Sequence, residues 1–370
     1  MTSQPHPIPA PDRAAEEAAR TRQGQLTKPP GALGRLEDLA CWLAGRLGQA
    51  VPEMPRCEIV VFAGDHGVAA QGVSAFPQAV TGQMLANFAA GGAAINVLAT
   101  LQDARLTVVD VGVANAGPPP DGVRNERVRA GTRDLAITAA MTEEEARQAL
   151  DAGARCAQRA ARHGAQLLIA GDMGIGNTTA AACLICAFSG VEPAEVVGRG
   201  TGLDDPGLER KVTVVRAALA RVAGDSPGRS PLEVLRAVPP APAEARARAA
   251  FEVLRQLGGL EIAAIAGYYL EAARLGLPML IDGYISTAGA LVAAHLEPAC
   301  RQWMQAGHRS AEAGHRHALA ALGLTPLLDL ELRLGEGTGA ALSLSIVRAA
   351  LALHRDMATF AAAGVSEKSA

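Results

Sequence analysis

The chain has 370 residues, of which 49% are hydrophobic and only 3% aromatic, so a large core must be built mainly from Ala, Leu and Val. The formal net charge is −3 and no block of Lys or Arg stands out, which excludes the electrostatic footprint of a nucleic-acid-binding protein. The polar, proline-rich start lacks the features of a signal peptide, and no apolar run reaches the ~20 residues that span a membrane. We therefore expect a cytoplasmic protein.

In chain order, the first fifty residues predict helices joined by a loop. Short apolar runs that predict buried strands then alternate with longer segments that predict helices. The strands are expected at 58–63, 106–114, 166–172 and 278–284, and the helices at 80–101, 142–163, 177–188, 205–222, 259–275 and 286–295. This alternation indicates an α/β fold with a mostly parallel sheet, and the stretch 223–246 is expected to be a loop-rich connection. Both ends of the chain look all-helical, which predicts a smaller second lobe.

Three of the predicted strands lead into an acidic residue beside glycine, namely Asp65, Asp172 and Asp282. The carboxyl ends of parallel strands face a shared crevice in which ligands bind. One such ending is as typical of an ordinary turn as of a functional site, whereas three in one chain indicate a lined pocket.

The segment 171–179 gives the strongest local signal. Gly174 and Gly176 let the backbone approach a ligand closely, and Asn177 and Thr178 open the helix that follows, where N–H groups and the helix dipole attract a phosphate. The glycine spacing matches neither the dinucleotide-binding fingerprint nor a Walker A loop. A tight strand–helix turn with threonine caps is the alternative that these residues leave open.

Two other glycine-rich turns are candidates. Gly200 and Gly202 precede a helix with Lys211, which can supply a positive charge to a phosphate, although the pattern alone is more typical of a solvated helix face. Glu336 stands between glycines ahead of an apolar helix, where its ionised form is favoured and can serve as a base. A charged turn that caps the helix fits the Glu336 pattern equally well.

No metal centre is predicted. His315 and His317 lie two residues apart on an expected helix, so their rings point to different sides, and no Cys or carboxylate stands at ligand spacing. Cys183 and Cys186 form a CxxC motif inside an apolar helical stretch, without a second Cys pair. This context favours plain core residues over redox or metal chemistry.

Taken together, a set of ordered segments between about residues 25 and 350 resembles the nicotinate-nucleotide–dimethylbenzimidazole phosphoribosyltransferase family. They are LTKPPGALGRLE, FAGDHGVAAQGVSAFPQAVTGQML, GGAAIN, GDMGIGNTTAAA, GRGTGLDD, GGLEIAAIAG, IDGYISTAGAL, SAEAGHRHAL and LDLELRLGEGTGAAL. A single motif of this kind occurs by chance, whereas the ordered set is highly specific.

The resemblance implies a doubly wound, mostly parallel, Rossmann-like α/β domain over 51–329 and a smaller helical domain made of 1–50 and 330–370. It also implies a homodimer and a transfer that needs neither a metal nor a cofactor. The small-molecule substrates it implies are nicotinate mononucleotide and 5,6-dimethylbenzimidazole. The products are α-ribazole 5′-phosphate and nicotinate, in the assembly of the nucleotide loop of cobalamin. No nucleic-acid or membrane partner is expected.

The functional residues of the family fall on matching positions of this chain. Glu336 matches the catalytic base, and Asp172 stands where the family usually has glutamate, so its shorter arm has less reach. The other matches are Lys211 after the GTGLDD segment, Ser310 at the phosphate, and Ser74, Phe76 and Gln83 in the base-binding segment.

Three other functions fit these residues less well. A transferase that uses phosphoribosyl pyrophosphate needs adjacent acidic residues that lead into a Thr/Gly phosphate loop, whereas Asp204 and Asp205 lead into Pro-Gly-Leu-Glu. A non-catalytic nucleotide-binding protein would be expected to lack the base, but Glu336 is present. A nicotinamide-dependent dehydrogenase is disfavoured by the glycine spacing. The sequence leaves the physiological base open.

Overall fold

The computed structural model describes residues 6–114, 117–224, 228–236 and 243–366. Its centre is a six-stranded parallel sheet in the order β3-β2-β1-β4-β5-β6. The strands are β1 (Cys57–Gly64), β2 (Arg105–Gly112), β3 (Val123–Asn125), β4 (Leu167–Met173), β5 (Met279–Ile281) and β6 (Met304–Ala306). The strand order reverses between β1 and β4, which confirms the α/β class and the doubly wound sheet.

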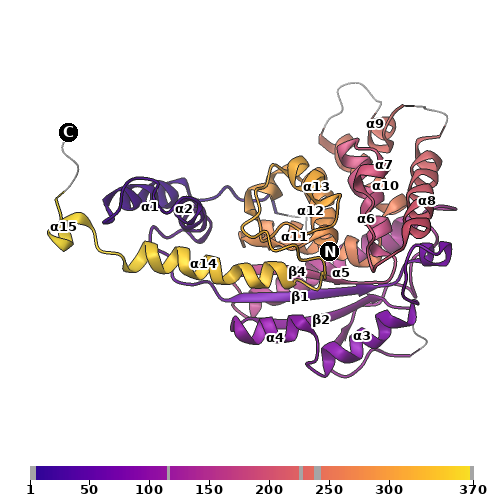
Figure 1. Ribbon diagram of the computed structural model, residues 1–370, viewed down its shortest axis with the longest axis horizontal. Coiled ribbons are helices and arrows are strands. Elements are labelled where there is room, and N and C mark those ends of the chain that lie inside the picture. The colour runs from indigo at the N-terminus through magenta and orange to yellow at the C-terminus, as the bar shows by residue number, and fades with distance from the viewer. Residues whose placement is uncertain (1–5, 115–116, 225–227, 237–242, 367–370) are drawn as a thin grey trace.

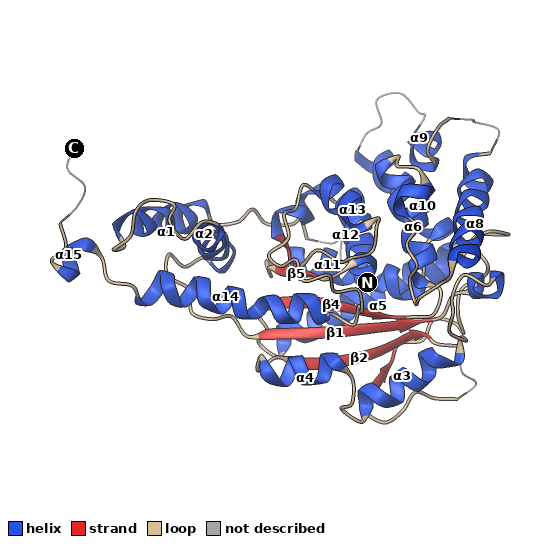
Figure 2. Ribbon diagram, viewed as in Figure 1, coloured by secondary structure: helices blue, strands red, loops and turns tan. Residues whose placement is uncertain are grey.

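Helices cover both faces of this sheet (Figures 1 and 2). They are α1 (Arg13–Gln25), α2 (Arg35–Leu47), α3 (Ala79–Ala89), α4 (Ala94–Leu101), α5 (Glu143–Arg162), α6 (Asn177–Ser189), α7 (Pro193–Val196), α8 (Asp205–Ala223), α9 (Pro231–Arg236), α10 (Ala243–Leu257), α11 (Leu260–Arg274), α12 (Tyr284–Leu296), α13 (His315–Leu322), α14 (Thr338–Asp356) and α15 (Phe360–Ala363). The described residues also form the 3-10 helices η1 (Gly67–Gln71) and η2 (Pro298–Trp303). Two clusters of buried hydrophobic side chains lie on the two faces of the sheet. Helices α5, α11 and α12 pack on one face, and α3, α4 and α14 on the other.

The central strand β1 explains why its sequence is apolar throughout. Val60 and Phe62 belong to the core on one face of the sheet, while Ile59 and Val61 belong to the core on the other face. A strand buried on both faces needs apolar side chains at every position rather than at alternate ones. The short apolar runs were therefore a sound basis for predicting β1, β2, β4 and β5.

Several sequence-based boundaries need correction. The loop expected over 223–246 contains α9 and the start of α10, while 225–227 and 237–242 lie outside the described residues. Helix α5 begins with a capping box, in which Thr142 and Glu145 exchange side chain–backbone hydrogen bonds. The cap of α8 is Asp204, whose carboxylate accepts from the Gly207 N–H at 2.9 Å.

The single helix expected over 80–101 is wrong. Segment Ala79–Leu101 is long and apolar enough, by length and composition alone, to cross a membrane. The chain turns after α3, however, where Gly91 takes a left-handed conformation (φ 79°), and α4 starts in a new direction. With 11 and 8 residues, neither helix approaches the ~20 residues that a membrane span needs.

Helices α5 and α11 are in backbone contact because each has a glycine that faces the backbone of the other helix. A Cβ atom at Gly153 would overlap the carbonyl oxygen of Ala264, and one at Gly267 would overlap that of Leu150. The atoms that these Cβ atoms would meet belong to the backbone and not to a flexible side chain, so the two helices would have to move apart to make room.

Replacing Gly153 with alanine is therefore expected to lower the free energy of unfolding by about 1–3 kcal/mol or more. Denaturant unfolding followed by circular dichroism measures this loss. The matched control is Gly24→Ala in α1, where nothing lies within 4 Å of the new methyl group. Equal stabilities of the two variants would contradict the close packing of α5 on α11.

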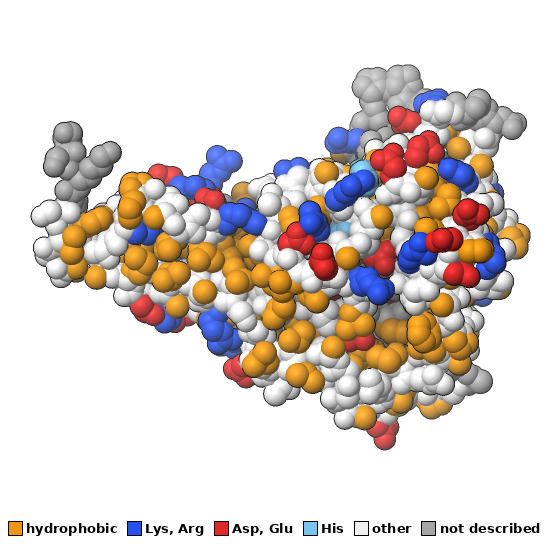
Figure 3. Space-filling view, in the orientation of Figure 1, with side chains coloured by type: hydrophobic (Ala, Val, Ile, Leu, Met, Phe, Trp, Pro, Cys, Tyr) orange, Lys and Arg blue, Asp and Glu red, His pale blue; other side chains and the backbone are white. Residues whose placement is uncertain are grey.

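The two ends of the chain meet in a helical region. Helices α1 and α2 pack against each other and α2 packs on α14, which extends from the sheet to this region (Figure 1). Gln23 and His354 hydrogen bond at 2.9 Å inside it. In Figure 3, hydrophobic side chains gather on the surface along α14 and over α4, and Val97 and Leu101 of α4 are exposed.

Candidate functional site

A cavity of about 280 Å³ lies at the carboxyl ends of β4 and β5, beside the point where the strand order reverses. Its lining comes from distant parts of the chain: Phe76, Asp172, Met173, Gly174, Ile175, Asn177, Thr178, Gly200, Thr201, Gly283, Tyr284, Ile285, His308, Ser310, Glu312, Arg333, Leu334 and Gly335. Many of the residues singled out in the sequence thus meet in one place. Asp65 does not line it; its buried carboxylate accepts hydrogen bonds from Thr81 and the Ala114 N–H, which is ordinary turn chemistry.

The segment 171–179 forms the end of β4, a glycine turn and the start of α6. Gly174 approaches the neighbouring backbone so closely that a Cβ atom would overlap the carbonyl oxygen of Gly64. Gly176 takes a left-handed conformation (φ 96°) behind the cavity, and no side chain caps α6. The threonine cap considered above is therefore absent, and the positive end of the helix dipole faces the cavity uncompensated, which favours an anion.

Lys211 is fully buried, so the solvated helix face suggested by the pattern alone is wrong. Its ammonium donates to Thr178 Oγ1 at 2.7 Å and to the Gly198 carbonyl at 3.2 Å. Lys211 stands directly behind the lining residues Thr178 and Gly200, whereas Gly202 is exposed and outside the cavity. Burial lowers the pKa of Lys211 to about 8, against the opposing effect of the Glu312 carboxylate.

Ser310 and Glu312 line the cavity from the segment between β6 and α13. The Glu312 N–H donates to Ser310 Oγ at 3.3 Å. Within the described part of the chain, Glu312 Oε2 is buried without a hydrogen-bond partner, and it lies so close to Gly198 that a Cβ atom there would overlap it. Such an oxygen suits a ligand hydroxyl. Sequence reasoning missed Glu312, although it lies inside the matched SAEAGHRHAL segment.

The base-binding segment contributes only in part. Ser74 Oγ lies 3.1 Å from Thr201 Oγ1, which also accepts from the Ala75 N–H, so this loop is joined to the second glycine turn. Phe76 lines the cavity with about half of its surface exposed (52%). Gln83 is exposed on α3 and does not line the cavity.

Glu336 lies at the edge of the site in an uncommon backbone conformation. Its φ of 64° is left-handed, and its N–H donates to the Asp172 carbonyl at 3.2 Å. Gly335 lines the cavity, but the Glu336 side chain does not; it is buried (5% exposed) and faces the Ile95 N–H at the start of α4. One carboxylate oxygen has no partner in the described residues.

The protonation of Glu336 differs from the sequence-based expectation. Burial raises the pKa of Glu336, with the Ile95 N–H opposing this effect and the negative charge of Asp282 adding to it. The ionised form is thus less favoured than a position beside a helix N-terminus alone suggests. A raised pKa lies closer to neutral pH, and a general base is most effective when its pKa is near the pH at which the enzyme works.

Asp172 joins the cavity to the Glu336 loop. Asn177 donates to Asp172 Oδ2 at 2.9 Å, whereas Oδ1 is buried without a partner in the described part of the chain. Burial raises the pKa of Asp172 well above its ordinary value, and the nearby carboxylates of Asp282, Glu261 and Glu336 add to this effect. Asp172 therefore holds a proton more readily than an exposed aspartate does.

Among the described residues, no group of three or more His, Cys, Asp or Glu side chains is arranged to hold a metal ion. Cys183 and Cys186 are buried in the core, as predicted, and burial raises the pKa of Cys186 to about 12. His308 lines the cavity, with Nε2 at 3.4 Å from Asp282 Oδ1.

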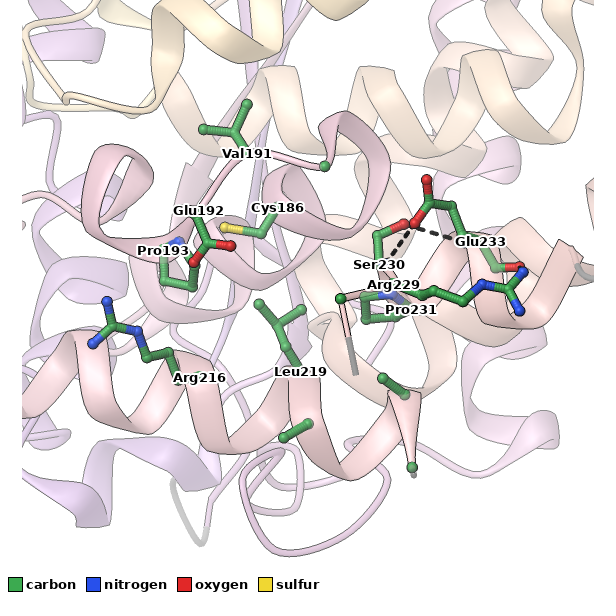
Figure 4. Close-up of a pocket in the computed structure, with 15 residues that line it drawn as sticks. Cys186, Val191, Glu192, Pro193, Arg216, Leu219, Arg229, Ser230, Pro231 and Glu233 are labelled. Carbon is green, nitrogen blue, oxygen red and sulfur yellow. Dashed lines mark hydrogen bonds between the residues drawn. The ribbon is translucent and has the colours of Figure 1, made fainter. Parts of the chain in front are cut away.

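A second cavity of about 410 Å³ lies between the end of α6 and α8, and Figure 4 shows its lining. Arg216 and Glu233 stand at opposite ends of it, and Glu233 accepts a hydrogen bond from the Ser230 N–H at 2.7 Å. Cys186 lines this cavity, but none of the predicted substrate-binding or catalytic residues does. Its charges do not converge on one point, so the cavity beside β4 remains the candidate site.

Comparison with known proteins agrees with this choice. The model of a phosphoribosyltransferase family matches residues 8–241 and 236–365. The chain belongs to this family. A nicotinate-nucleotide–dimethylbenzimidazole phosphoribosyltransferase of Chromobacterium violaceum is 54% identical over 360 residues, 97% of this chain and 98% of the relative. The protein of that name from Mycobacterium avium is 53% identical over 364 residues, 98% of each chain.

Solved structures of the family agree in fold. A crystal structure of the Thermus thermophilus enzyme named nicotinate-nucleotide–dimethylbenzimidazole phosphoribosyltransferase superposes with a TM-score of 0.85 at 49% identity, over 96% of this chain and 100% of that one. A second structure from the same organism gives 0.86 at 50% identity with the same coverage. The family resemblance inferred from the ordered motifs is confirmed.

Proposed function

We propose that this protein transfers the phosphoribosyl group of nicotinate mononucleotide to 5,6-dimethylbenzimidazole, which yields α-ribazole 5′-phosphate and nicotinate for the nucleotide loop of cobalamin. Relatives that carry this enzyme name match the chain over nearly its full length. The observation that carries the proposal is one cavity at the uncapped start of α6 with the Lys211 ammonium behind it, next to the loop in which Glu336 follows the lining residue Gly335.

The site residues divide between the two substrates. The donor phosphate suits the start of α6, with Asn177, Thr178, Gly174 and Gly176, together with Gly200, Gly202, Lys211 and Ser310. The unpaired oxygens of Asp172 and Glu312 suit donor hydroxyls. Ser74, Phe76 and Gln83 stay assigned to the acceptor. Only Phe76 of these three lines the cavity, so Gln83 requires an acceptor that extends towards α3.

The chemistry needs one base and no acid. The bond between C1′ and the pyridinium nitrogen breaks, and its electron pair leaves with the ring, which becomes neutral at that nitrogen. A ring nitrogen of the acceptor attacks C1′ from the opposite side, which inverts the anomeric carbon. The other acceptor nitrogen sheds its proton to the Glu336 carboxylate. Holding the donor in line supplies much of the rate.

The direct test mixes the purified protein with nicotinate mononucleotide and 5,6-dimethylbenzimidazole. Liquid chromatography with mass spectrometry should find nicotinate and α-ribazole 5′-phosphate in equal amounts, and no nicotinate release when the base is left out. Phosphoribosyl pyrophosphate replaces the donor in a parallel reaction. Product formed only from the pyrophosphate would overturn the proposed donor.

Excess chelator is expected to leave the rate unchanged, because no step of the proposed transfer uses a metal ion. Initial rates with and without ethylenediaminetetraacetate, measured on the same enzyme preparation, test this point. A loss that added magnesium restores would instead support the mechanism of a pyrophosphate-dependent transferase.

We also propose a cytoplasmic homodimer with the two-domain division 1–50 plus 330–370 and 51–329. The exposed apolar side chains of Val97 and Leu101 on α4 favour burial against a second copy. The six free, buried cysteines fit a reducing compartment. Light scattering on purified protein should give twice the mass of one chain, and a monomer mass would remove the dimer from the proposal.

A further inference from the structure

The loop that carries Glu336 has three consecutive residues in the left-handed region. The φ angles of Gly335, Glu336 and Gly337 are 84°, 64° and 88°. Glycine adopts this conformation freely, but for a residue with a side chain it costs about 1–2 kcal/mol. Such strain persists only where surrounding contacts determine the conformation.

Asp282 supplies two of the contacts around this loop. It directly follows β5 and is completely buried. Its Oδ2 accepts from the Gly337 N–H at 3.1 Å, and its Oδ1 accepts from the Ala340 N–H at 2.8 Å. One carboxylate thus binds the first turn of α14 and the residue directly after Glu336. No side chain of α14 itself caps the helix.

His308 holds Asp282 from the other side. His308 Nε2 lies 3.4 Å from Asp282 Oδ1, and a Cβ atom at Gly339 would overlap the His308 ring. The glycine therefore lets the first turn of α14, the histidine and the carboxylate come together. Burial by itself disfavours the Asp282 charge, but hydrogen bonds from His308 and from backbone N–H groups outweigh it, and the pKa of Asp282 is lowered.

We propose that Asp282 is a positioning residue for Glu336: by binding the Gly337 and Ala340 N–H groups, it fixes the left-handed backbone that sets the direction of the Glu336 carboxylate. The inference rests on the proposed role of Glu336 as the base. Proton transfer requires donor and acceptor atoms within about 2.6–3.2 Å, so a small rotation of this loop moves the base out of range. Asp282 does not itself line the cavity, although its partner His308 does.

The test is a double-mutant cycle with Asp282→Asn and Glu336→Gln. Asparagine keeps the shape of aspartate but turns one oxygen into an NH2 group, which cannot accept from the backbone N–H it faces. We expect Asp282→Asn to lower kcat between about 10- and 100-fold in the natural background. In the Glu336→Gln background it should lower kcat less than about twofold, because no base is left to misplace. Asp329→Asn, at an exposed ion pair with Arg309, serves as the control and should keep full activity.

The outcomes separate the two proposals. Near-normal activity of Glu336→Gln would overturn the base assignment itself. If that variant is inactive but a folded Asp282→Asn keeps full kcat, or loses the same factor in both backgrounds, the positioning role is wrong. If Asp282→Asn does not fold, Gly337→Ala replaces it, because the added methyl group disturbs the backbone around the same N–H group. The double-mutant cycle with Glu336→Gln is then repeated, and the positioning role is wrong if Gly337→Ala keeps full kcat or loses the same factor in both backgrounds.

Discussion

Replacing Glu336 with glutamine is expected to lower kcat by about 10² to 10⁴-fold, the usual contribution of a general base. Glutamine keeps the size of the side chain but cannot accept the proton that the acceptor must lose. Both substrates should still bind, because the Glu336 side chain does not line the cavity. Single-turnover kinetics, together with the acceptor dissociation constant from calorimetry, separates the chemical step from binding.

Glu331 provides the matched control for this substitution. It is also a glutamate with left-handed backbone (φ 57°) in the segment ahead of α14, but it is exposed. Glu331→Gln should keep kcat within about twofold of the natural protein, as is usual for exposed surface positions. Equal losses in the two variants would show that a carboxylate in this segment matters for a reason other than proton transfer.

Replacing Lys211 with methionine is expected to lower kcat/KM for the donor on the order of 10²-fold, with a much smaller effect on the acceptor. Removing one partner of a buried charge pair leaves the phosphate uncompensated, which costs about 2–5 kcal/mol. Methionine fills most of the space of the lysine stem. The control is Arg216→Met, which removes an exposed cation from the same helix beside the second cavity.

Lys211 also predicts a pH dependence. Burial lowers its pKa to about 8, so before the donor binds its ammonium is charged below that pH and neutral above it. Donor binding should therefore weaken as the pH rises through about 8, with kcat/KM falling up to tenfold per pH unit. The Lys211→Met variant should lack this decline, and a decline that survives the substitution belongs to another group.

The parts of the fold that the sequence predicted are those fixed by one strong local signal. The strands β1 and β4 are buried on both faces, so their composition alone marks them. The edge strands β3 and β6 have three residues each, which is too few to show an alternation of apolar and polar residues. The 223–246 stretch looked like a loop because of its Gly and Pro content, but the helices within it are stabilised by packing on distant elements.

The candidate site shows the same division. Glycine turns are visible in the sequence because special backbone geometry restricts the residue type, and Gly174 and Gly176 were found in this way. Burial of a charged residue depends on what packs over it. The sequence pattern therefore suggested that Lys211 is exposed to solvent, whereas α6 and the second glycine turn enclose it. Asp282 binds the backbone N–H groups of Gly337 and Ala340, and Glu312 lies against Gly198; no local spacing marks contacts between residues so far apart along the chain.

The glycine contact between α5 and α11 bears on how substrates enter. Two helices whose backbones touch at Gly153 and Gly267 have no side-chain layer in which to slide or rotate, so they and the sheet beneath them behave as one rigid body. Any opening that admits a nucleotide must then come from the loops at the carboxyl ends of the strands. Substitutions at this helix contact are therefore expected to change the stability of the fold more than the movement of the loops around the site.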